Sequence, residues 1–284
     1  MEALRASQYR DFTVVVVDHG TTDETRIGLA SEFPEVIRIA GPSDAWWTGA
    51  TNVGIRFALD QGADMLMLLN NDSYVTPETI GVLIRLGQQN TTAIIAPIQR
   101  DWQSGKITTI SIRSFFLLGF PTTAGPRKLT AAMSTKELLA VKLIRGGRGV
   151  IIPVKVFTRM GLFDEAHLPH YYADHDFYLR ASRHNIPLYV STRTFIDIDD
   201  TRTTLADNPG SLNFSEFLHS LRSIRSHRNL KFITAVFRKH YPIPYLHLFG
   251  VALYTGRYVL VYLIKRMVFL LRGYLTNACS RWRN

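Results

Sequence analysis

The chain has 284 residues, of which 46% are hydrophobic and 20% charged, and it holds one cysteine, Cys279. This composition excludes disordered, collagen-like and highly charged tail proteins, and a single cysteine excludes a disulfide framework. The net charge of +10 arises at one end, because residues 217–284 hold twelve basic residues and no acidic one, so we expect a nearly neutral body, residues 1–205, and a basic tail, residues 206–284.

Short apolar runs alternate with helical patterns along the body. Residues 13–17 are β-branched and uniformly apolar, which is typical of a parallel strand covered on both faces. Further strands are predicted at residues 36–40, 64–69, 93–97, 149–153 and 187–190, with a possible strand at 106–112. Helices are predicted at residues 52–61 and 174–184. One further helix is expected to begin at Thr76, another to end at Met160, and residues 119–128 are expected to form a loop. The alternation predicts an α/β fold with a mostly parallel sheet, in which ligands bind beyond the carboxyl ends of strands.

Three separated segments carry motifs that point to one family. Residues 13–25 read TVVVVDHGTTDET, and residues 46–72 read WWTGATNVGIRFALDQGADMLMLLNND. Residues 147–190 hold a glycine-rich strand, a GLFDE turn and the acidic helix start ADHD. In this order the segments resemble family 2 glycosyltransferases, and WWTGATN resembles rhamnosyltransferase-type members that act on bacterial surface polysaccharides. The resemblance, which extends over residues 1–200, implies a GT-A fold and an inverting transfer from a nucleotide-diphosphate sugar.

The resemblance also implies a divalent cation, Mg²⁺ or Mn²⁺, on the donor's diphosphate. Such a cation neutralises the charge that develops on the leaving group, and both ions prefer oxygen ligands. Asp72 follows a buried strand and suits this role, with Asn70 at the first position of the family's DxD-like element. An ordinary turn is the alternative interpretation of residues 70–72.

Two carboxylates in one helical turn are candidates for the general base that takes the proton of the acceptor hydroxyl. Asp174 matches the Asp of the family's acidic pair, whose Glu is Ala173 here, and Asp176 matches a later acidic position. We expect Asp174 to be the base and Asp176 to be the second candidate. Both carboxylates also suit a helix N-terminus, where the helix dipole favours negative charge, and the two interpretations are compatible.

Several residues lie at positions that the family uses to hold the nucleotide-sugar. These are Asp18, His19, Trp47, Asn52, Gly54 and Asn71, although His19 departs from the usual Asn or Asp. Helix packing explains Gly54 equally well, and Trp47 is expected either to stack on a sugar or base or to pack in the core. Arg145 and Arg148 are interpreted as solvated surface cations rather than phosphate ligands. Asp197, Asp199 and Asp200 follow the last strand, and whether one of them touches the metal is left open.

The resemblance further implies a first strand, between those at residues 13–17 and 64–69, that the chain does not show. We therefore expect a GT-A sheet that lacks this strand and leaves two strand edges unpaired. A catalytically inactive relative that only binds a membrane or a partner enzyme is the alternative function.

The tail is apolar over residues 245–275, with four basic residues inserted and no uncharged run long enough for a clean membrane span. We expect a C-terminal amphipathic α-helix on the cytoplasmic face of the membrane, drawn to anionic lipid by a basic stripe of His247, Lys265 and Arg272 with Arg257 nearby. A single span and a soluble packing or dimer helix are the alternatives. A glycan or lipid-linked acceptor suits this location. Nucleic acid is not expected as a partner, because the charge lies among Leu, Val and Tyr.

Overall fold

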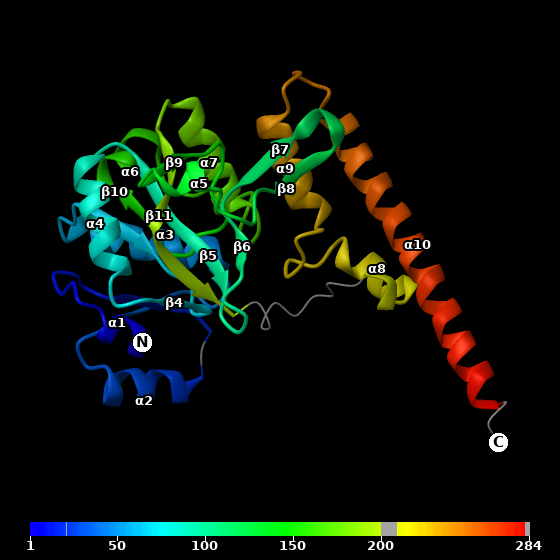
Figure 1. Ribbon diagram of the computed structural model, residues 1–284, viewed down its shortest axis with the longest axis horizontal. Coiled ribbons are helices and arrows are strands. Elements are labelled where there is room, and N and C mark those ends of the chain that lie inside the picture. The colour runs from blue at the N-terminus through cyan, green and yellow to red at the C-terminus, as the bar shows by residue number, and fades with distance from the viewer. Residues whose placement is uncertain (21, 200–208, 282–284) are drawn as a thin grey trace. The chain divides into compact units, whose positions relative to one another are not determined.

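The computed structural model describes residues 1–20, 22–199 and 209–281, which form parts of two compact units. The first unit holds Met1–Arg113 and residues 123–199, and the second holds Ser114–Thr122 together with residues 209–281. The predicted division at residue 205 lies outside the described residues. Residues 114–122, which form the tip of a hairpin, also belong to the second unit, and the predicted division does not include this exchange (Figure 1).

The first unit alternates helices and strands. Its helices are α1 (Glu2–Arg5), α2 (Asp23–Glu32), α3 (Trp46–Asp60), α4 (Thr79–Gln89), α5 (Ala131–Ser134), α6 (Val154–Met160) and α7 (Ala173–Arg183). Its strands are β1 (Val15–Asp18), β2 (Ile37–Ala40), β3 (Met65–Leu68), β4 (Ser73–Val75), β5 (Ile94–Asp101), β6 (Ile107–Thr109), β9 (Leu138–Ala140), β10 (Val150–Pro153) and β11 (Leu188–Ile198). The predicted α/β class is confirmed.

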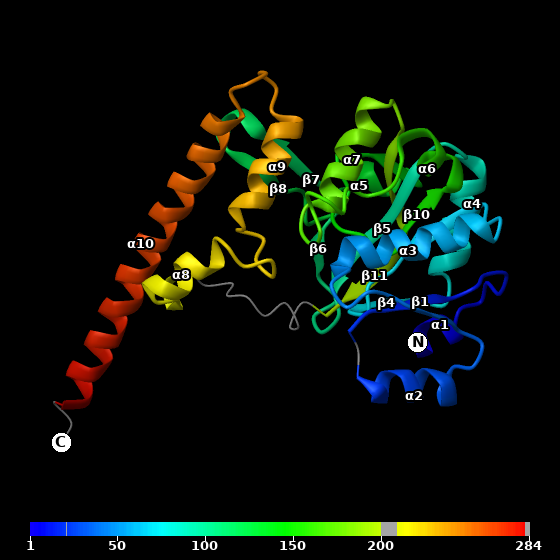
Figure 2. The same cartoon turned by 180° about the vertical axis from the view of Figure 1, so that it is seen from behind.

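The main sheet has the strand order β3-β10-β5-β11-β4, with β6 beside β5 and β9 beside β11. It is mixed: β5 and β11 are parallel, whereas β10 is antiparallel to both of its neighbours, β3 and β5. Strands β3, β5 and β11 therefore run in one direction, as the sequence predicts. Ile94, Ile95 and Ile98 of β5 are fully buried, because the strand is central and helices cover both faces of the sheet (Figure 2).

Strands β1 and β2 form a separate parallel pair, in register from Val15 opposite Ile37 to Asp18 opposite Ala40. Val15, Val16 and Val17 are only half-buried, so the prediction of a strand covered on both faces is wrong in its extent. The described residues place no strand between β1 and β3, where the sequence predicts a gap. Helix α3 packs against both strands across this interval.

Helix α3 begins at Trp46, six residues before the predicted start at Asn52. Its first turn lacks a side-chain cap and is held by tertiary contacts instead. The Thr48 N–H donates to the Pro169 carbonyl at 3.0 Å, and the Thr48 hydroxyl donates to the Leu168 carbonyl at 2.6 Å. Local cap signals therefore could not locate this helix start.

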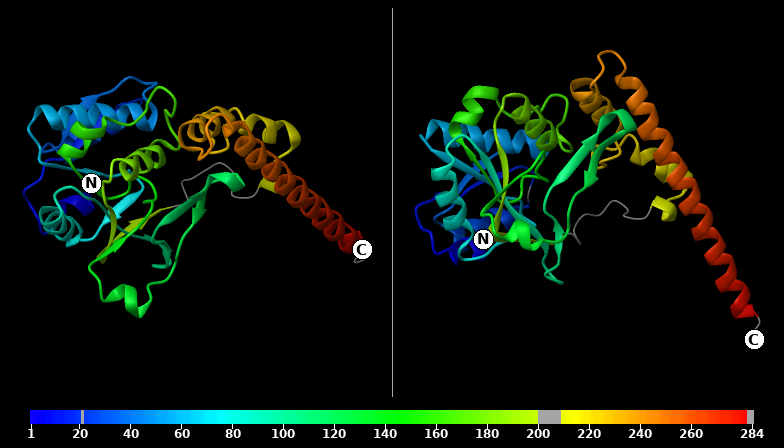
Figure 3. Two further views of the ribbon diagram at one scale, coloured as in Figure 1. Left: turned by 90° about the horizontal axis from the view of Figure 1, so that it is seen from above. Right: turned by 45° about the horizontal axis from the view of Figure 1, so that its top comes forward.

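The second unit is a hairpin tip and a set of helices (Figure 3). Its elements are η1 (Phe116–Leu118) between β7 (Ile112–Phe115) and β8 (Phe120–Ala124), then η3 (Pro209–Ser211), α8 (Phe214–Ser220), α9 (Leu230–His240) and α10 (His247–Arg281). The sequence predicts a loop where β8 lies. Buried aromatic and aliphatic side chains form its core, including Phe116, Phe217, Ile233, Phe237 and Tyr254.

Among the described residues, α10 holds one stretch long and apolar enough to cross a membrane, His247–Leu271, with a mean hydropathy of 1.3. The stretch meets this requirement by its length and composition alone, and little of it is buried within the fold.

Candidate active site

The turn that follows β3 carries the predicted cation ligands. Leu66 and Leu68 point into the core, and the chain then turns at Asn70, where the carbonyl accepts the Ser73 N–H at 3.2 Å. Asn71 is exposed at the tip of this turn, whereas Asp72 is half-buried. Strand β3 therefore delivers an exposed amide and a sheltered carboxylate to one edge of the sheet.

A glycine-rich loop, residues 145–149, lies beside this turn. Gly146 and Gly149 have φ angles of +68° and +71°, which side-chain-bearing residues rarely adopt. A Cβ on Gly147 would lie 2.8 Å from the Trp47 ring, and the Gly149 N–H donates to the Leu68 carbonyl at 2.7 Å. The glycines allow the loop to pass close to the end of β3.

The loop places Arg148 on the predicted cation ligand. An Arg148 guanidinium nitrogen lies 2.9 Å from Asp72 Oδ2, and both side chains are only 15% exposed. The interpretation of Arg148 as a solvated surface cation is therefore wrong. In the sequence, Arg148 stands between two glycines. This was the available signal that Arg148 lies close to other groups, because glycine-rich loops allow the backbone and its side chains to approach a ligand.

Asp174 lies in the first turn of α7, close to the same loop. Burial raises the pKa of its carboxyl, while hydrogen bonds from backbone amides and the charge of Arg148 oppose that rise. The Tyr178 hydroxyl, one turn further along, donates to the Gly146 carbonyl at 2.8 Å. Burial and the nearby Asp174 carboxylate raise the pKa of Tyr178 well above its ordinary value. The predicted base and the predicted cation ligand thus come together around Arg148.

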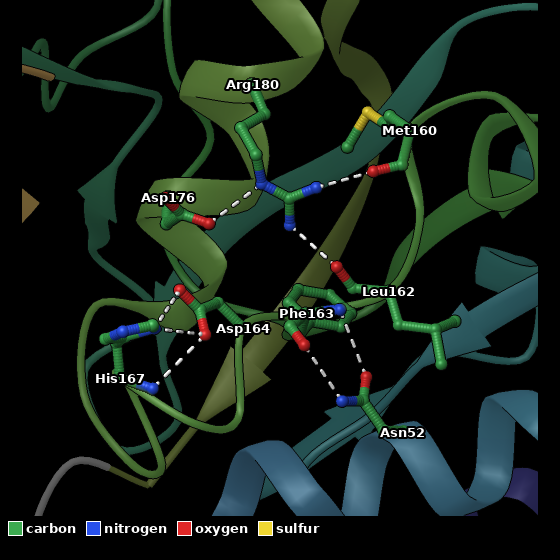
Figure 4. Close-up of polar contacts among 8 residues, drawn as sticks. All are labelled: Asn52, Met160, Leu162, Phe163, Asp164, His167, Asp176 and Arg180. Carbon is green, nitrogen blue, oxygen red and sulfur yellow. Dashed lines mark hydrogen bonds and ion pairs between the residues drawn. The ribbon is translucent and has the colours of Figure 1, made fainter. Parts of the chain in front are cut away.

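Asp176 faces a different environment from Asp174. It is fully buried, and its Oδ2 accepts a hydrogen bond from Arg180 Nε at 2.9 Å (Figure 4). The remaining Arg180 nitrogens donate to the Met160 and Leu162 carbonyls at 2.8 and 2.7 Å. This geometry does not favour Asp176 as second candidate base, because its carboxylate is fully buried and pairs with the arginine that holds the loop.

Asn52 holds the same loop from the other side. Its amide nitrogen donates to the Phe163 carbonyl at 2.9 Å, and its oxygen accepts the Phe163 N–H at 3.1 Å (Figure 4). The residue is 1% exposed, so this geometry does not support a direct contact with a donor. A Cβ on Gly54 would lie 3.2 Å from Val17 Cγ2, which indicates that Gly54 serves the packing of α3 on β1. Both residues build the scaffold of the site.

Trp47 connects the start of α3 to the cation-ligand turn. Its indole N–H donates to Asn70 Oδ1 at 3.0 Å, and its ring meets Phe163 edge-on at a centroid distance of 5.5 Å. In this state Trp47 orients Asn70, and its half-buried ring lies against Gly147. These contacts agree with the packing alternative for Trp47, and its contact with the donor stays a prediction.

Asp18 and His19 lie at the end of β1, in the two-stranded sheet. Asp18 is buried and pairs with Arg38 of β2 at 2.6 Å. Arg38 has no motif signal in the sequence, and only the parallel register of β1 and β2 brings it opposite the Asp18 region. The half-exposed His19 follows directly.

The oxygen atoms around Asp72 are of the type that Mg²⁺ and Mn²⁺ prefer, but they are too few to fill the coordination shell of either ion. No group of three His, Cys, Asp or Glu side chains within the described residues forms a ready-made cation site. The Asp199 N–H donates to the Asp72 carbonyl at 3.0 Å, whereas Asp197 pairs with Arg100 at 2.8 Å, and Asp200 lies outside the described residues. A cation here would need oxygens from a bound diphosphate and an Asp72 carboxylate released from Arg148.

Comparison with known proteins supports the fold and the family. The model of the family described as glycosyl transferase family 2 matches residues 1–145, just over half of the chain. A search of curated proteins finds no match.

Solved structures share the fold at low sequence identity. The crystal structure of GalNAc-T7 with UDP, GalNAc and Mn²⁺ has a TM-score of 0.59 at 12% identity, and the match covers 88% of this chain and 50% of that one. The chain thus spans half the length of that relative. Structures of S. aureus TarS 1-349 with UDP-GlcNAc and with UDP have TM-scores of 0.54 and 0.50 at 12% and 14% identity, and each match covers 94% of this chain and 86% of that one.

Proposed function

The chain belongs to glycosyl transferase family 2, and from this premise we propose that it transfers a sugar, with inversion, from a nucleotide-diphosphate sugar to an acceptor hydroxyl. One observation carries the proposal. Arg148 lies against Asp72 at 2.9 Å and next to Asp174, so the proposed base and the proposed diphosphate-binding turn both lie beside the loop of residues 145–149.

In this reaction Asp174 takes the proton. The acceptor oxygen attacks the anomeric carbon, its proton passes to an Asp174 carboxylate oxygen, and the carbon–oxygen bond to the diphosphate breaks with its electron pair on the leaving group. A base whose pKa is raised by burial binds the proton more firmly, which favours this transfer.

Arg148 faces the developing charge of the diphosphate, and its rigid guanidinium matches phosphate oxygens. Trp47 orients Asn70 through the indole N–H, and Asn71 is exposed for contact with the donor. A divalent cation held by Asp72 and Asn70 would neutralise the leaving diphosphate when it is bound with the donor.

The finer identity of the substrates is part of the proposal. The WWTGATN segment supports a rhamnose-like donor and a glycan or lipid-linked acceptor in surface polysaccharide synthesis. The solved structures of similar fold contain UDP or UDP-GlcNAc, which supports a nucleotide-diphosphate donor in general.

A panel of nucleotide-sugars, followed by mass spectrometry with purified protein and Mg²⁺ or Mn²⁺, tests the proposal. We expect one donor class to be consumed, and Asp174→Asn to abolish that consumption. Asp23→Asn is the matched control, because this carboxylate is 85% exposed on α2. Failure of every donor, with and without acceptor lipid extracts, would contradict the proposal.

A binding protein without transfer activity is the second candidate, and the separation of the β1–β2 pair from the main sheet favours it. Such a protein would hold a partner or a membrane and show neither donor consumption nor protection by nucleotide-sugars against thermal unfolding.

A further inference from the structure

Helix α10 has an unusual distribution of polar and apolar side chains within the second unit. Tyr254 and Tyr262, spaced for one helix face, are buried against the rest of the unit, and Arg257 and Arg266 are half-buried. The large aliphatic and aromatic side chains of α10 are instead exposed, among them Leu248, Phe249, Leu260, Leu263, Ile264 and Met267. A helix of a water-soluble unit shows the opposite arrangement, and a large exposed apolar face marks an interaction surface.

Two basic side chains of α10 are held inside the unit. The Arg257 guanidinium lies 3.6 Å from the centroid of the Phe120 ring, and an Arg266 nitrogen donates to the Gly210 and Ser211 carbonyls at 3.3 Å. Lys265 is exposed, and the Arg272 side chain lies outside the described residues. Arg257, which the sequence places near the outward basic stripe, is therefore turned into the unit instead. The apolar side chains, rather than the arginines, form the outer face.

The hairpin tip adds a second exposed apolar element beside α10. Phe116 is buried and packs edge-on against Phe237 of α9 at 5.3 Å. Gly119 lies so close to α10 that a Cβ would approach the Tyr254 backbone nitrogen to 2.7 Å. Leu117 and Leu118, between these anchors, remain 48% and 64% exposed. The tip is thus fixed on α9 and α10 while its two leucines point to solvent.

The charge of the second unit favours an anionic partner. After Glu216, whose side chain accepts the Asn213 N–H at 2.7 Å, no acidic residue follows. Five exposed cations lie in this part of the chain: Arg222, Arg225, Lys231, Arg238 and Lys265. Exposed leucines combined with exposed cations fit a bilayer that contains anionic headgroups.

We infer that the second unit docks in the plane of an anionic membrane through the outer apolar face of α10 together with Leu117 and Leu118. This inference goes beyond the proposed transfer reaction and does not depend on it. The packing of α10 on α9 and η3, and the stacking of Phe217 of α8 on Tyr262 of α10 at 4.0 Å, support an in-plane position (Figures 1 and 2). A span would carry the exposed Arg222 and the capped start of α8 into hydrocarbon, where polar groups are costly.

Binding to vesicles tests the inference with the full chain. Sedimentation with phosphatidylcholine vesicles, with and without phosphatidylglycerol, is compared for the unmodified protein and a Leu117→Asp/Leu118→Asp variant. We expect binding that requires phosphatidylglycerol, and affinity lower by about tenfold or more in the variant, because two apolar side chains leave the bilayer. Ile27→Asp is the control, since Ile27 is 57% exposed on α2 of the first unit.

A fluorescent probe separates loss of docking from loss of folding. The Leu118→Trp variant, which keeps the site apolar, is mixed with vesicles of brominated lipid, and Ile27→Trp serves as its control. We expect quenching for Leu118→Trp beyond that of the control. Equal quenching in the two variants, equal vesicle affinity of the aspartate variant, or a dimer that ignores vesicles would each overturn the inference.

Discussion

Asp174 and Asp176 lie in one helical turn but in different surroundings. Asp174 lies near Arg148 and the glycine-rich loop, whereas Asp176 is fully buried and pairs with Arg180 at 2.9 Å. A general base needs access to a substrate hydroxyl, and a buried ion pair needs isolation from it. Only Asp174 meets the first requirement.

Substituting the two residues separately distinguishes these roles. We expect Asp174→Asn to lower kcat by about 10²–10⁴-fold without loss of stability, because it removes a carboxylate that burial destabilises. We expect Asp176→Asn to lower the free energy of unfolding by about 3 kcal/mol, because Arg180 loses its counter-charge. Donor consumption and thermal unfolding measure the two effects, and a stable but inactive Asp176→Asn protein would contradict the assignment.

The raised pKa of Asp174 links activity and stability to pH in opposite directions. The folded-state pKa exceeds the unfolded one, so the folded protein binds the proton more tightly, and this group's contribution to stability falls as pH rises through that window. In the proposed reaction the unprotonated Asp174 is the active form, so we expect kcat/KM to fall as pH decreases through the same pKa. Burial raises this pKa, and backbone amides and the charge of Arg148 lower it.

Comparing the wild-type protein with Asp174→Asn at several pH values checks this coupling. We expect the stability advantage of the Asn variant to be largest near neutral pH and to shrink on acidification. A difference that is independent of pH would show that Asp174 has the same pKa in the folded and unfolded states.

At the scale of elements, the loop between α6 and α7 is held from two sides. Asn52 of α3 binds both backbone groups of Phe163, and Arg180 of α7 binds the Met160 and Leu162 carbonyls. The loop therefore fixes the position of α7, and with it Asp174, relative to the helix that carries Trp47. Residues matched to a family's ligand-binding motif here serve to align the elements.

Substitution of Asn52 tests this scaffolding role. We expect Asn52→Ala to lower the free energy of unfolding by about 1–3 kcal/mol, because it leaves two buried backbone groups without their partners. The donor KM of the folded enzyme should stay unchanged. Asn71→Ala is the comparison, since this exposed residue should raise the donor KM and leave the unfolding temperature as it is. If Asn52→Ala instead raised the donor KM and left the stability unchanged, Asn52 would contact the donor and the scaffolding role would be wrong.

At the scale of the whole molecule, the charge and the apolar surface belong to the second unit. Binding that combines headgroup attraction with apolar insertion should weaken with salt without disappearing, because ions screen only the first contribution. We expect the affinity for vesicles to be lower at high than at low ionic strength, while a measurable affinity remains. Alkaline carbonate should release the protein, as expected of an in-plane helix. Retention in the bilayer after carbonate treatment would instead indicate a span.

The fold class, most element positions, the turn that holds Asp72 and the concentration of positive charge in the tail could be predicted from the sequence, and Asp174 stays a candidate base. These follow from local patterns such as apolar runs, turn residues and motif spacing. Which side chains contact each other, in contrast, depends on the packing of the elements. Arg148 reaches Asp72 across 76 residues, and Asn52 reaches Phe163 across 111. This packing also turned Arg257 inward and placed the hairpin tip on α10. Such contacts depend on how the elements pack, and local sequence patterns do not give the distances between segments so far apart in the chain.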